Sequence, residues 1–301
     1  MYDILVVGGG TAGLTAAIYA RRAGRTVLVL ESTGFGGQIT ASHLVENYPG
    51  IPAVSGLDYS DALLKQAKDL GAETKFAQVT GAEQIPGGFR LTAGKKEFEG
   101  KALILATGAK HRTLGLPQEE ELVGRGVSYC AVCDGAFFKD KDTAVAGGGD
   151  SALQSALFLS GVAKSVALIH RRDTFRAQAA YVEAAKTKAN ITFVMDSNVT
   201  ALEGENTLNA ITLTDKSGGS KTIPVEGLFI EVGQIPDNGP FAQLAELDGG
   251  GYFAAGEDCR TKTPGVFVAG DCRSKELRQL TTAAADGSVA ATAACQWLDE
   301  R

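Results

Sequence analysis

A glycine-rich stretch near the start of the chain restricts the possible fold more than any other feature of the sequence. GGGTAG occupies residues 8–13, after a short apolar run at 3–7. A helical pattern follows at 14–23, and a second apolar run at 26–30 ends at Glu31. Strand, glycine turn, helix and strand in this order predict a βαβ unit with parallel strands.

The glycines of this turn are spaced as in a dinucleotide-binding fingerprint. Gly8 and Gly10 allow a tight turn and let backbone N–H groups approach a pyrophosphate, and Gly13 lets the helix pack close to the strand. Glu31 stands where a carboxylate can accept hydrogen bonds from ribose hydroxyls. Because a carboxylate repels a 2′-phosphate, the site is expected to suit FAD or NAD better than NADP.

The same arrangement recurs later in the chain. GGGDSA at 147–152 lies between apolar runs at 143–146 and 165–169, with a helix expected at 153–161. Alanine replaces the third glycine of the fingerprint. We expect this second turn to bind a second dinucleotide through Gly147, Gly149, Asp150, Ser151 and Ala152.

The second βαβ unit ends in basic residues where the first ends in an acid. HRRDTFRA places His170, Arg171, Arg172 and Arg176 at the end of its second strand. Guanidinium groups form bidentate hydrogen bonds with phosphate, so this end is expected to hold the 2′-phosphate of NADPH. A solvated basic face is the alternative.

Two such units in one chain predict two nucleotide-binding domains rather than one. Glycine and proline cluster near 110–115 and 235–242, which suggests that the second domain is inserted into the first. The expected fold class is α/β, with two Rossmann-like domains and a discontinuous first domain. The expected limits are 1–112 and 241–301 for the first domain, which suits FAD or NAD, and 113–240 for the second, which suits NADPH.

The stretch YCAVCDG (129–135) carries two cysteines three residues apart. Cys130 and Cys133 could form half a metal site, a structural disulfide or a redox pair. Zinc needs two more ligands at a workable spacing, and the other cysteines stand singly, so no metal is expected. A loop this short constrains the unfolded chain very little. Redox exchange is favoured, with the Asp134 carboxyl moving the proton that accompanies thiol formation.

Charge and composition narrow the range of partners. The formal net charge is −6 and no long basic block appears, which argues against nucleic acid and anionic membrane surfaces. No apolar run approaches the roughly 18 residues of a membrane span, and no secretory signal is visible. Five cysteines, an odd number, do not suggest a disulfide scaffold, so a cytoplasmic location is expected.

Taken together, the two glycine turns and the intervening CxxCD closely resemble the low-molecular-weight bacterial thioredoxin reductase family. The likeness covers essentially the whole chain and includes GGQI, VENYPG, ATGA, TPGVFVAGDC and LRQLTTAAADG. One departure is ALQSA (152–156), which is less acidic than expected. The resemblance implies further FAD-binding residues, namely Gly36, Gly37, Gln38, Asn47, Asp271, Arg278, Gln279 and Leu280. The last three would direct N–H groups and a helix dipole toward the flavin ring.

The resemblance also implies a reaction and an assembly. Electrons would pass from NADPH to FAD, then to the Cys130–Cys133 disulfide, and finally to thioredoxin. Cys133 would face the flavin and Cys130 would attack the partner, and the protein would be a homodimer. Since the cysteines and the NADPH site share one domain, that domain is expected to rotate about connections near 112 and 240. Phe137 and Phe138 are expected either to contact thioredoxin or to belong to the core.

Two other functions are compatible with the same residues. The first is a flavin disulfide reductase whose partner is a peroxiredoxin or a glutaredoxin-like protein. The second is a redox-sensing flavoprotein that does not turn over, in which CxxC is a switch or a zinc knuckle.

Overall fold

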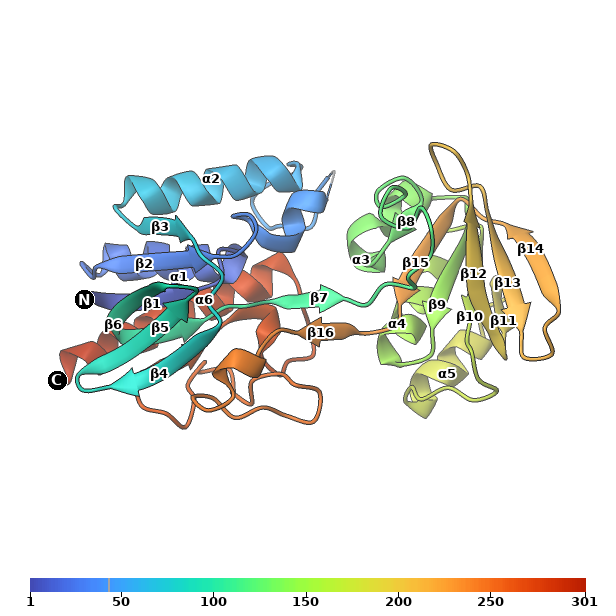
Figure 1. Ribbon diagram of the computed structural model, residues 1–301. Coiled ribbons are helices and arrows are strands. Elements are labelled where there is room, and N and C mark those ends of the chain that lie inside the picture. The colour runs from blue at the N-terminus through green and yellow to red at the C-terminus, as the bar shows by residue number, and fades with distance from the viewer. Residues whose placement is uncertain (43) are drawn as a thin grey trace. The chain divides into compact units, whose positions relative to one another are not determined.

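The computed structural model describes residues 1–42 and 44–301 and divides the chain into two compact units (Figure 1). The first unit consists of Met1–Lys110 and Ile235–Arg301, and the second of His111–Gln234. The second unit is thus inserted in the sequence of the first. The chain passes between them in β7 (Ala109–His111) and β16 (Gln234–Pro236), two short strands that pair with each other. The predicted α/β fold class, with an inserted unit, is confirmed.

The first unit is built on a mixed sheet with the order β3-β2-β1-β6-β5-β4, and β17 pairs with β6. Strands β1, β2, β3, β6 and β17 run parallel to their neighbours, whereas β4, β5 and β6 form an antiparallel meander. The strands are β1 (Tyr2–Val7), β2 (Val27–Glu31), β3 (Glu73–Phe76), β4 (Gly81–Ile85), β5 (Gly88–Ala93), β6 (Lys96–Leu105) and β17 (Val266–Val268).

Helices α1 (Thr11–Arg22), α2 (Gly56–Asp69) and α6 (Leu280–Asp299) belong to the same unit, with the 3₁₀ turns η1 (Gly37–Ala41), η3 (Gly239–Phe241) and η4 (Gly270–Cys272). The sequence interpretation contained no helix at 56–69. Its start is nevertheless visible in the sequence, because the Ser55 Oγ accepts the Asp58 N–H at 3.0 Å as an N-cap. Within residues 1–42 and 44–301, no helix combines the length and apolar character needed to cross a bilayer.

Alternating side chains of β1 face two different cores. Ile4 and Val6 pack with α1 and α6 on one side of the sheet. Leu5 and Val7 pack on the other side, against Phe89 of β5 and apolar residues of 241–253. Both faces are covered, as expected for parallel strands with continuous apolar runs.

The second unit has a parallel sheet with the order β11-β10-β9-β15-β8 and a separate antiparallel sheet, β12-β13-β14. The parallel strands are β8 (Val127–Ser128), β9 (Asp142–Gly147), β10 (Ser165–Ile169), β11 (Ile191–Val194) and β15 (Gly227–Glu231). The antiparallel strands are β12 (Ser197–Glu203), β13 (Ala210–Asp215) and β14 (Ser220–Pro224), and the helical segments are α3 (Ala131–Asp134), η2 (Gly135–Phe138), α4 (Asp150–Ser160) and α5 (Ala179–Lys186).

Two cores also flank the parallel sheet of the second unit. Ala144 of β9 and Leu228 of β15 pack against residues of β12 and β13. On the opposite face, Val145 and Phe229 pack against α4. The parallel sheet of this unit therefore lies between a helix layer and a second sheet.

Candidate functional site

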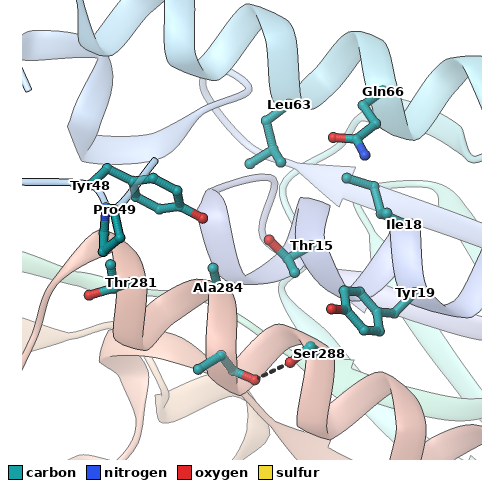
Figure 2. A pocket seen from close by; sticks show the side chains of 11 residues that line it. Thr15, Ile18, Tyr19, Tyr48, Pro49, Leu63, Gln66, Thr281, Ala284 and Ser288 are labelled. Atoms are coloured by element: carbon teal, nitrogen blue, oxygen red, sulfur yellow. Dashed lines mark hydrogen bonds between the residues drawn. The ribbon is translucent and has the colours of Figure 1, made fainter. Parts of the chain in front are cut away.

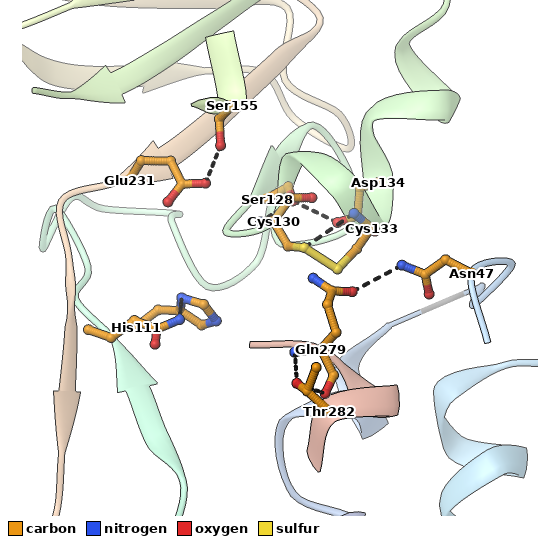
Figure 3. Close-up of a disulfide and its surroundings, with 11 residues drawn as sticks. Asn47, His111, Ser128, Cys130, Cys133, Asp134, Ser155, Glu231, Gln279 and Thr282 are labelled. Atoms are coloured by element: carbon orange, nitrogen blue, oxygen red, sulfur yellow. Dashed lines mark hydrogen bonds between the residues drawn. A yellow bond between two sulfur atoms is a disulfide. The ribbon is translucent and has the colours of Figure 1, made fainter. Parts of the chain in front are cut away.

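Cys130 and Cys133 form a disulfide in the second unit, with their Cα atoms 5.3 Å apart (Figure 3). Cys130 is the N-cap of the short helix α3, and its Sγ accepts the N–H of Cys133 at 3.2 Å. A donor aimed at this sulfur favours negative charge on it once the disulfide opens. The geometry therefore favours Cys130 as the thiolate of the reduced pair.

Ser128 connects both ends of the cysteine motif. Its Oγ donates to the Asp134 Oδ2 at 2.7 Å and accepts the N–H of Cys130 at 3.0 Å. The carboxyl named from the sequence is thus held next to the disulfide by a short polar chain, which Figure 3 shows. Sequence reasoning did not include Ser128, although its position two residues before Cys130 is a usable signal.

A buried carboxylate supports the residue that precedes Cys130. Glu119 accepts hydrogen bonds from the N–H groups of Leu114 and Leu116 and from the Tyr129 hydroxyl at 2.7 Å. The Tyr129 ring stacks on His111, with centroids 5.1 Å apart. Burial raises the pKa of Tyr129 and lowers the pKa of His111, so both groups are neutral near pH 7. The segment that leads into the disulfide is therefore well anchored.

The remaining three cysteines are not part of this centre. Cys259, Cys272 and Cys295 are buried free thiols. Burial raises the pKa of each, that of Cys259 to about 12, so none is a thiolate at neutral pH. In the part of the chain that the structure describes, no three His, Cys, Asp or Glu side chains are grouped to hold a metal ion.

The first glycine turn lies between β1 and α1. A Cβ at Gly13 would lie 1.9 Å from the Gly8 oxygen, whereas a Cβ at Gly10 would meet nothing closer than 3.7 Å. Gly13 is thus required by packing, and Gly10 leaves room beside the N-terminus of α1. That helix has no side-chain cap, so its first N–H groups remain available to a phosphate.

Glu31 is buried beside this turn, and its carboxylate already has partners. Its Oε2 accepts the Gly9 N–H at 2.7 Å, and its Oε1 accepts the Thr33 N–H at 2.9 Å. These bonds fix the turn relative to the end of β2. The Oε1 also accepts the Ser32 and Thr33 hydroxyls at 3.3 Å, whereas the Oε2 retains a second lone pair for a ribose hydroxyl.

A buried, unsatisfied carboxylate oxygen marks the loop after β17. The Asp271 Oδ1 has no hydrogen-bond donor among the described residues, and burial raises the pKa of this carboxyl. A ligand hydroxyl at this point would supply the missing donor. The residues present therefore fit a ribityl-bearing flavin.

Buried polar groups brace the Asp271 loop. Asn238, which sequence reasoning missed, accepts the Thr107 hydroxyl and donates to the carbonyls of Gly251 and Cys272. Arg273 pairs with Asp286 of α6 at 2.8 Å, and both side chains are buried. These contacts tie the loop to the segment that follows β6, to residue 251 and to α6.

Arg278 and Gln279 lie differently from the expectation. The Arg278 guanidinium donates to the carbonyls of Asp271, Arg273 and Lys275 and stacks on Tyr252. The Gln279 N–H donates to the Thr282 Oγ1 at 3.1 Å in a capping box, so it is not available to a ligand. Leu280 begins α6, and its N–H has no intrahelical partner.

The other expected flavin residues lie near these elements in the first unit. Gly36 and Gly37 have φ of 109° and 71°, values that residues other than glycine rarely adopt. The Gln38 amide donates to the Ala109 carbonyl, and the Asn47 amide donates to the Gln279 Oε1 at 3.1 Å (Figure 3). Gln38 and Asn47 thus join the segment after β2 to β7 and α6.

The second glycine turn ends β9. A Cβ at Gly147 would lie 2.3 Å from the Glu231 oxygen, but a Cβ at Gly149 would meet no atom within 4 Å. Ala152 is fully buried, and its Cβ faces Gly147, which explains the small residue there. Ser151 is exposed in the first turn of α4.

Asp150 has a structural partner rather than a free carboxylate. Its oxygens accept the Gln178 N–H at 2.7 Å and the Gln178 side-chain amide at 3.1 Å. The Arg176 N–H donates to the Gly148 oxygen at 2.8 Å. These bonds bring the loop after β10 against the glycine turn, so Arg176 lies beside a helix N-terminus that is distant in sequence.

The basic strand end divides into exposed and buried residues. Arg171, Arg172 and Arg176 are exposed, and within the described residues none of them forms an ion pair. His170 is buried, stacks on Phe175 and faces Gly148, where a Cβ would lie 2.1 Å from its ring. Burial lowers the pKa of His170. The structure therefore does not present His170 as a cationic phosphate ligand, because its ring is used in packing.

A groove of about 410 Å³ lies in the first unit between α1, α2 and α6 (Figure 2). Tyr19 from α1, Leu63 and Gln66 from α2 and Ser288 from α6 line it. It follows the middle of α1 rather than its N-terminus. The groove is therefore separate from the glycine turn.

Comparison with known proteins agrees with this site. The model of the pyridine nucleotide-disulphide oxidoreductases matches residues 2–287. The thioredoxin reductase of Listeria monocytogenes is 41% identical over 302 residues, which cover 100% of this chain and 95% of the relative. The solved thioredoxin reductase of Streptococcus pyogenes has a TM-score of 0.94 at 38% identity, covering 100% of this chain and 99% of its own. That of Lactococcus lactis, titled as the FR conformation, has a TM-score of 0.70 at 38% identity and covers 100% of both chains.

The three relatives named above match nearly the whole chain and are all called thioredoxin reductase, and the disulfide and both glycine turns lie within the matched residues. The chain belongs to the pyridine nucleotide-disulphide oxidoreductases and, within them, to the thioredoxin reductase family.

Proposed function

We propose that the protein uses NADPH to reduce the disulfide of thioredoxin, through FAD and the Cys130–Cys133 pair. The observation that carries this proposal is the disulfide at the start of α3, tied to Asp134 through Ser128, in a unit that also has an NADP-type turn. The names of the relatives support thioredoxin as the partner. A peroxiredoxin or a glutaredoxin-like protein is the alternative partner.

The first unit is the proposed FAD site. Three features support this assignment: the space beside Gly10, the uncapped N-terminus of α1 and the unsatisfied Oδ1 of Asp271. The second unit is the proposed NADPH site, supported by the space at Gly149 and by the exposed Arg171, Arg172 and Arg176. When bound, the flavin supplies two-electron transfer between nicotinamide and disulfide.

The cysteine pair stores the two electrons. When the Cys130–Cys133 bond breaks, each sulfur gains one electron and, as a thiol, one proton. Asp134 is positioned to hold one of these protons, and the Cys133 N–H stabilises a thiolate on Cys130. Cys133 is the proposed sulfur that faces the flavin.

Electron transfer to the partner oxidises the cysteine pair back to a disulfide. The Cys130 thiolate attacks one sulfur of the partner's disulfide, and the other sulfur leaves and takes up a proton. Cys133 then attacks Cys130 in the mixed disulfide, which reforms the Cys130–Cys133 bond and releases the partner as a dithiol. Overall, NADPH, one proton and a disulfide give NADP⁺ and a dithiol.

The surface around the cysteines suits a protein partner. Val132, Phe137 and Phe158 are large apolar residues that remain exposed, with exposed fractions of 50%, 42% and 40%. Phe138, in contrast, is buried against Phe229. Phe137 is therefore the proposed contact for thioredoxin, and Phe138 belongs to the core.

A rotation of the second unit is part of the proposal. The cysteines and the NADPH turn both belong to that unit, and both must reach one flavin held by the other unit. Two short connections, β7 and β16, join the units, and hinges typically lie in such segments. The unequal TM-scores of two relatives at 38% identity are consistent with a family that adopts more than one conformation.

We further propose a cytoplasmic homodimer. Three free cysteines beside one redox pair suit a reducing compartment. Exposed Tyr19 and Val289 on α1 and α6 supply apolar surface near the groove for a second copy. A sedimentation mass equal to one chain would contradict the dimer.

The test of the proposed function is Cys133→Ser in the flavin-loaded enzyme. NADPH should still bleach the flavin in stopped flow, but thioredoxin-dependent insulin reduction should be lost, because the serine oxygen cannot form a disulfide. Cys295→Ser, which changes a buried thiol outside the pair, is the control and should retain turnover. If Cys133→Ser still turns over, electrons do not pass through the cysteine pair. If NADPH cannot reduce the flavin of the wild type quickly, the redox-sensing flavoprotein is favoured instead.

A further inference from the structure

The carboxyl end of β15 carries an acid to which the proposed mechanism gives no role. Glu231 is the last residue of β15 and is paired in register with Gly147, the last residue of β9. In this sheet β9 lies between β10 and β15, so the strand order reverses there: the chain adds β10 and β11 on one side of β9 and later adds β15 on the other. Open α/β sheets bind ligands at such a switch point, beyond the carboxyl ends of the strands.

The Glu231 side chain is held in a defined position at this point. The Ser155 hydroxyl of α4 donates to the Glu231 Oε1 at 2.6 Å, and Figure 3 shows the two side chains directed toward one another. The Glu231 backbone also touches the glycine turn, since a Cβ at Gly147 would clash with its oxygen at 2.3 Å. Ser155 belongs to ALQSA, the stretch that is less acidic than the family pattern. In this chain an acid is supplied next to that stretch by Glu231 of β15.

The elements packed against the end of β15 offer no described cation to Glu231. β9 contributes Gly147, and α4 contributes Ser155 and Asp150, whose carboxylate binds Gln178. β8 leads to Asp134, whose Oδ2 accepts from Ser128. Arg112, bonded through its N–H to the Gly233 oxygen, is exposed. Burial raises the pKa of Glu231 to about 7, and the Ser155 hydrogen bond opposes that rise.

The strand order determines which half of the coenzyme would reach Glu231. The exposed Arg171 and Arg172 follow β10 and would hold the 2′-phosphate of the adenosine half. The N-terminus of α4 would hold the pyrophosphate. β15 lies on the other side of β9 from β10, so the nicotinamide half would extend toward Glu231.

We propose that the Glu231 carboxylate, oriented by Ser155, faces the nicotinamide ring and binds the cationic oxidised coenzyme more tightly than the uncharged reduced one. The inference rests on the proposed function, because it requires NADP(H) in the second unit. A positive ring favours the ionised carboxyl, so binding of NADP⁺ releases a proton from Glu231. Binding of NADP⁺ therefore tightens as pH rises through 7, and that of an uncharged ring does not.

Calorimetric titration of the flavin-loaded enzyme at pH 6 and pH 8 tests this. The two probes are NADP⁺ and 1,4,5,6-tetrahydro-NADP. The second keeps the pyrophosphate and the 2′-phosphate but has an uncharged, unreactive ring. In the wild type, the ratio of their dissociation constants should change about tenfold between the two pH values in favour of NADP⁺. In Glu231→Gln, which cannot ionise, the ratio should be the same at both.

Three further variants make the result interpretable. Glu183→Gln, on the exposed face of α5, removes one carboxyl elsewhere and should behave as the wild type. Ser155→Ala removes the hydrogen bond that favours the carboxylate, so the pH midpoint should move upward; this variant serves if Glu231→Gln does not fold. Arg171→Ala with Arg172→Ala should weaken both probes equally.

The possible failures are distinguishable. The wild type could bind both probes with a ratio of dissociation constants that does not depend on pH, or Glu231→Gln could keep the pH dependence. In either case the proposed role of Glu231 is wrong and the proposed function stands. If the wild type binds neither probe nor 2′,5′-ADP, the coenzyme assignment is wrong, and the role of Glu231 falls with it.

Discussion

At the scale of single residues, Glu231 should make the folded protein less stable at neutral pH. Its pKa of about 7 lies above the ordinary 4.5 because of burial. Between these values the folded chain keeps a proton that the unfolded chain loses, so the free energy of unfolding falls as pH rises. Glu231→Gln should therefore raise Tm relative to the wild type at pH 8 and much less at pH 4.5. Thermal unfolding at both values checks this, and an equal difference at the two would contradict the burial of the carboxyl.

Other residues show why roles read from sequence are only partly reliable. Residue type and spacing identified the Cys130–Cys133 pair, because the chemistry and the contact are both local. His170 has the right type and position for a phosphate ligand, but its ring packs under Gly148. The N–H of Gln279 is similarly used by Thr282. Such contacts depend on side-chain direction, which a linear pattern does not specify.

At the scale of elements, both βαβ units could be predicted from periodicity and glycine spacing. β10 occurs at 165–169 as expected, because buried parallel strands are continuous apolar runs. In the stretch GVFVAGD (265–271), β17 is confined to Val266–Val268. Gly270, with φ of 82°, then turns the chain into η4 and aims Asp271 inward. Helix α2 was not predicted, although Tyr59, Leu63 and Ala67 recur at helical spacing on the face that packs against the core.

The two glycines of the second turn should fail in different ways when replaced. Gly147→Ala places a methyl group 2.3 Å from the Glu231 oxygen, so the free energy of unfolding should fall by an amount typical of overpacking, about 1–3 kcal/mol, and Tm should fall with it. Gly149→Ala meets no atom within 4 Å and should leave Tm unchanged. It should still weaken 2′,5′-ADP binding at least tenfold, because the methyl group occupies the path of the phosphate. Calorimetry and thermal unfolding of both variants measure this.

The opposite pattern would change the interpretation of the turn. If Gly149→Ala binds 2′,5′-ADP as the wild type does, the phosphate does not approach the backbone there. Gly218→Ala provides no suitable control, since its φ of 89° adds strain of its own. Gly161→Ala, at the C-terminal end of α4 with φ of −86°, changes a glycine of the same unit without strain or close contact.

At the scale of the whole molecule, the insertion should make the second unit separable. Residues 111–234 are contiguous, contain both of their own cores and have ends that meet, since the Arg112 N–H donates to the Gly233 oxygen at 3.0 Å. We expect this segment alone to unfold cooperatively and to bind 2′,5′-ADP like the full chain. Its Cys130–Cys133 disulfide should form but should resist NADPH, because the proposed flavin site belongs to the first unit. Circular dichroism, calorimetry and thiol titration measure these properties. If NADPH reduces the isolated segment, electrons reach the cysteines without the flavin. The second unit would then not need to rotate to bring first the NADPH site and then the cysteines to the flavin.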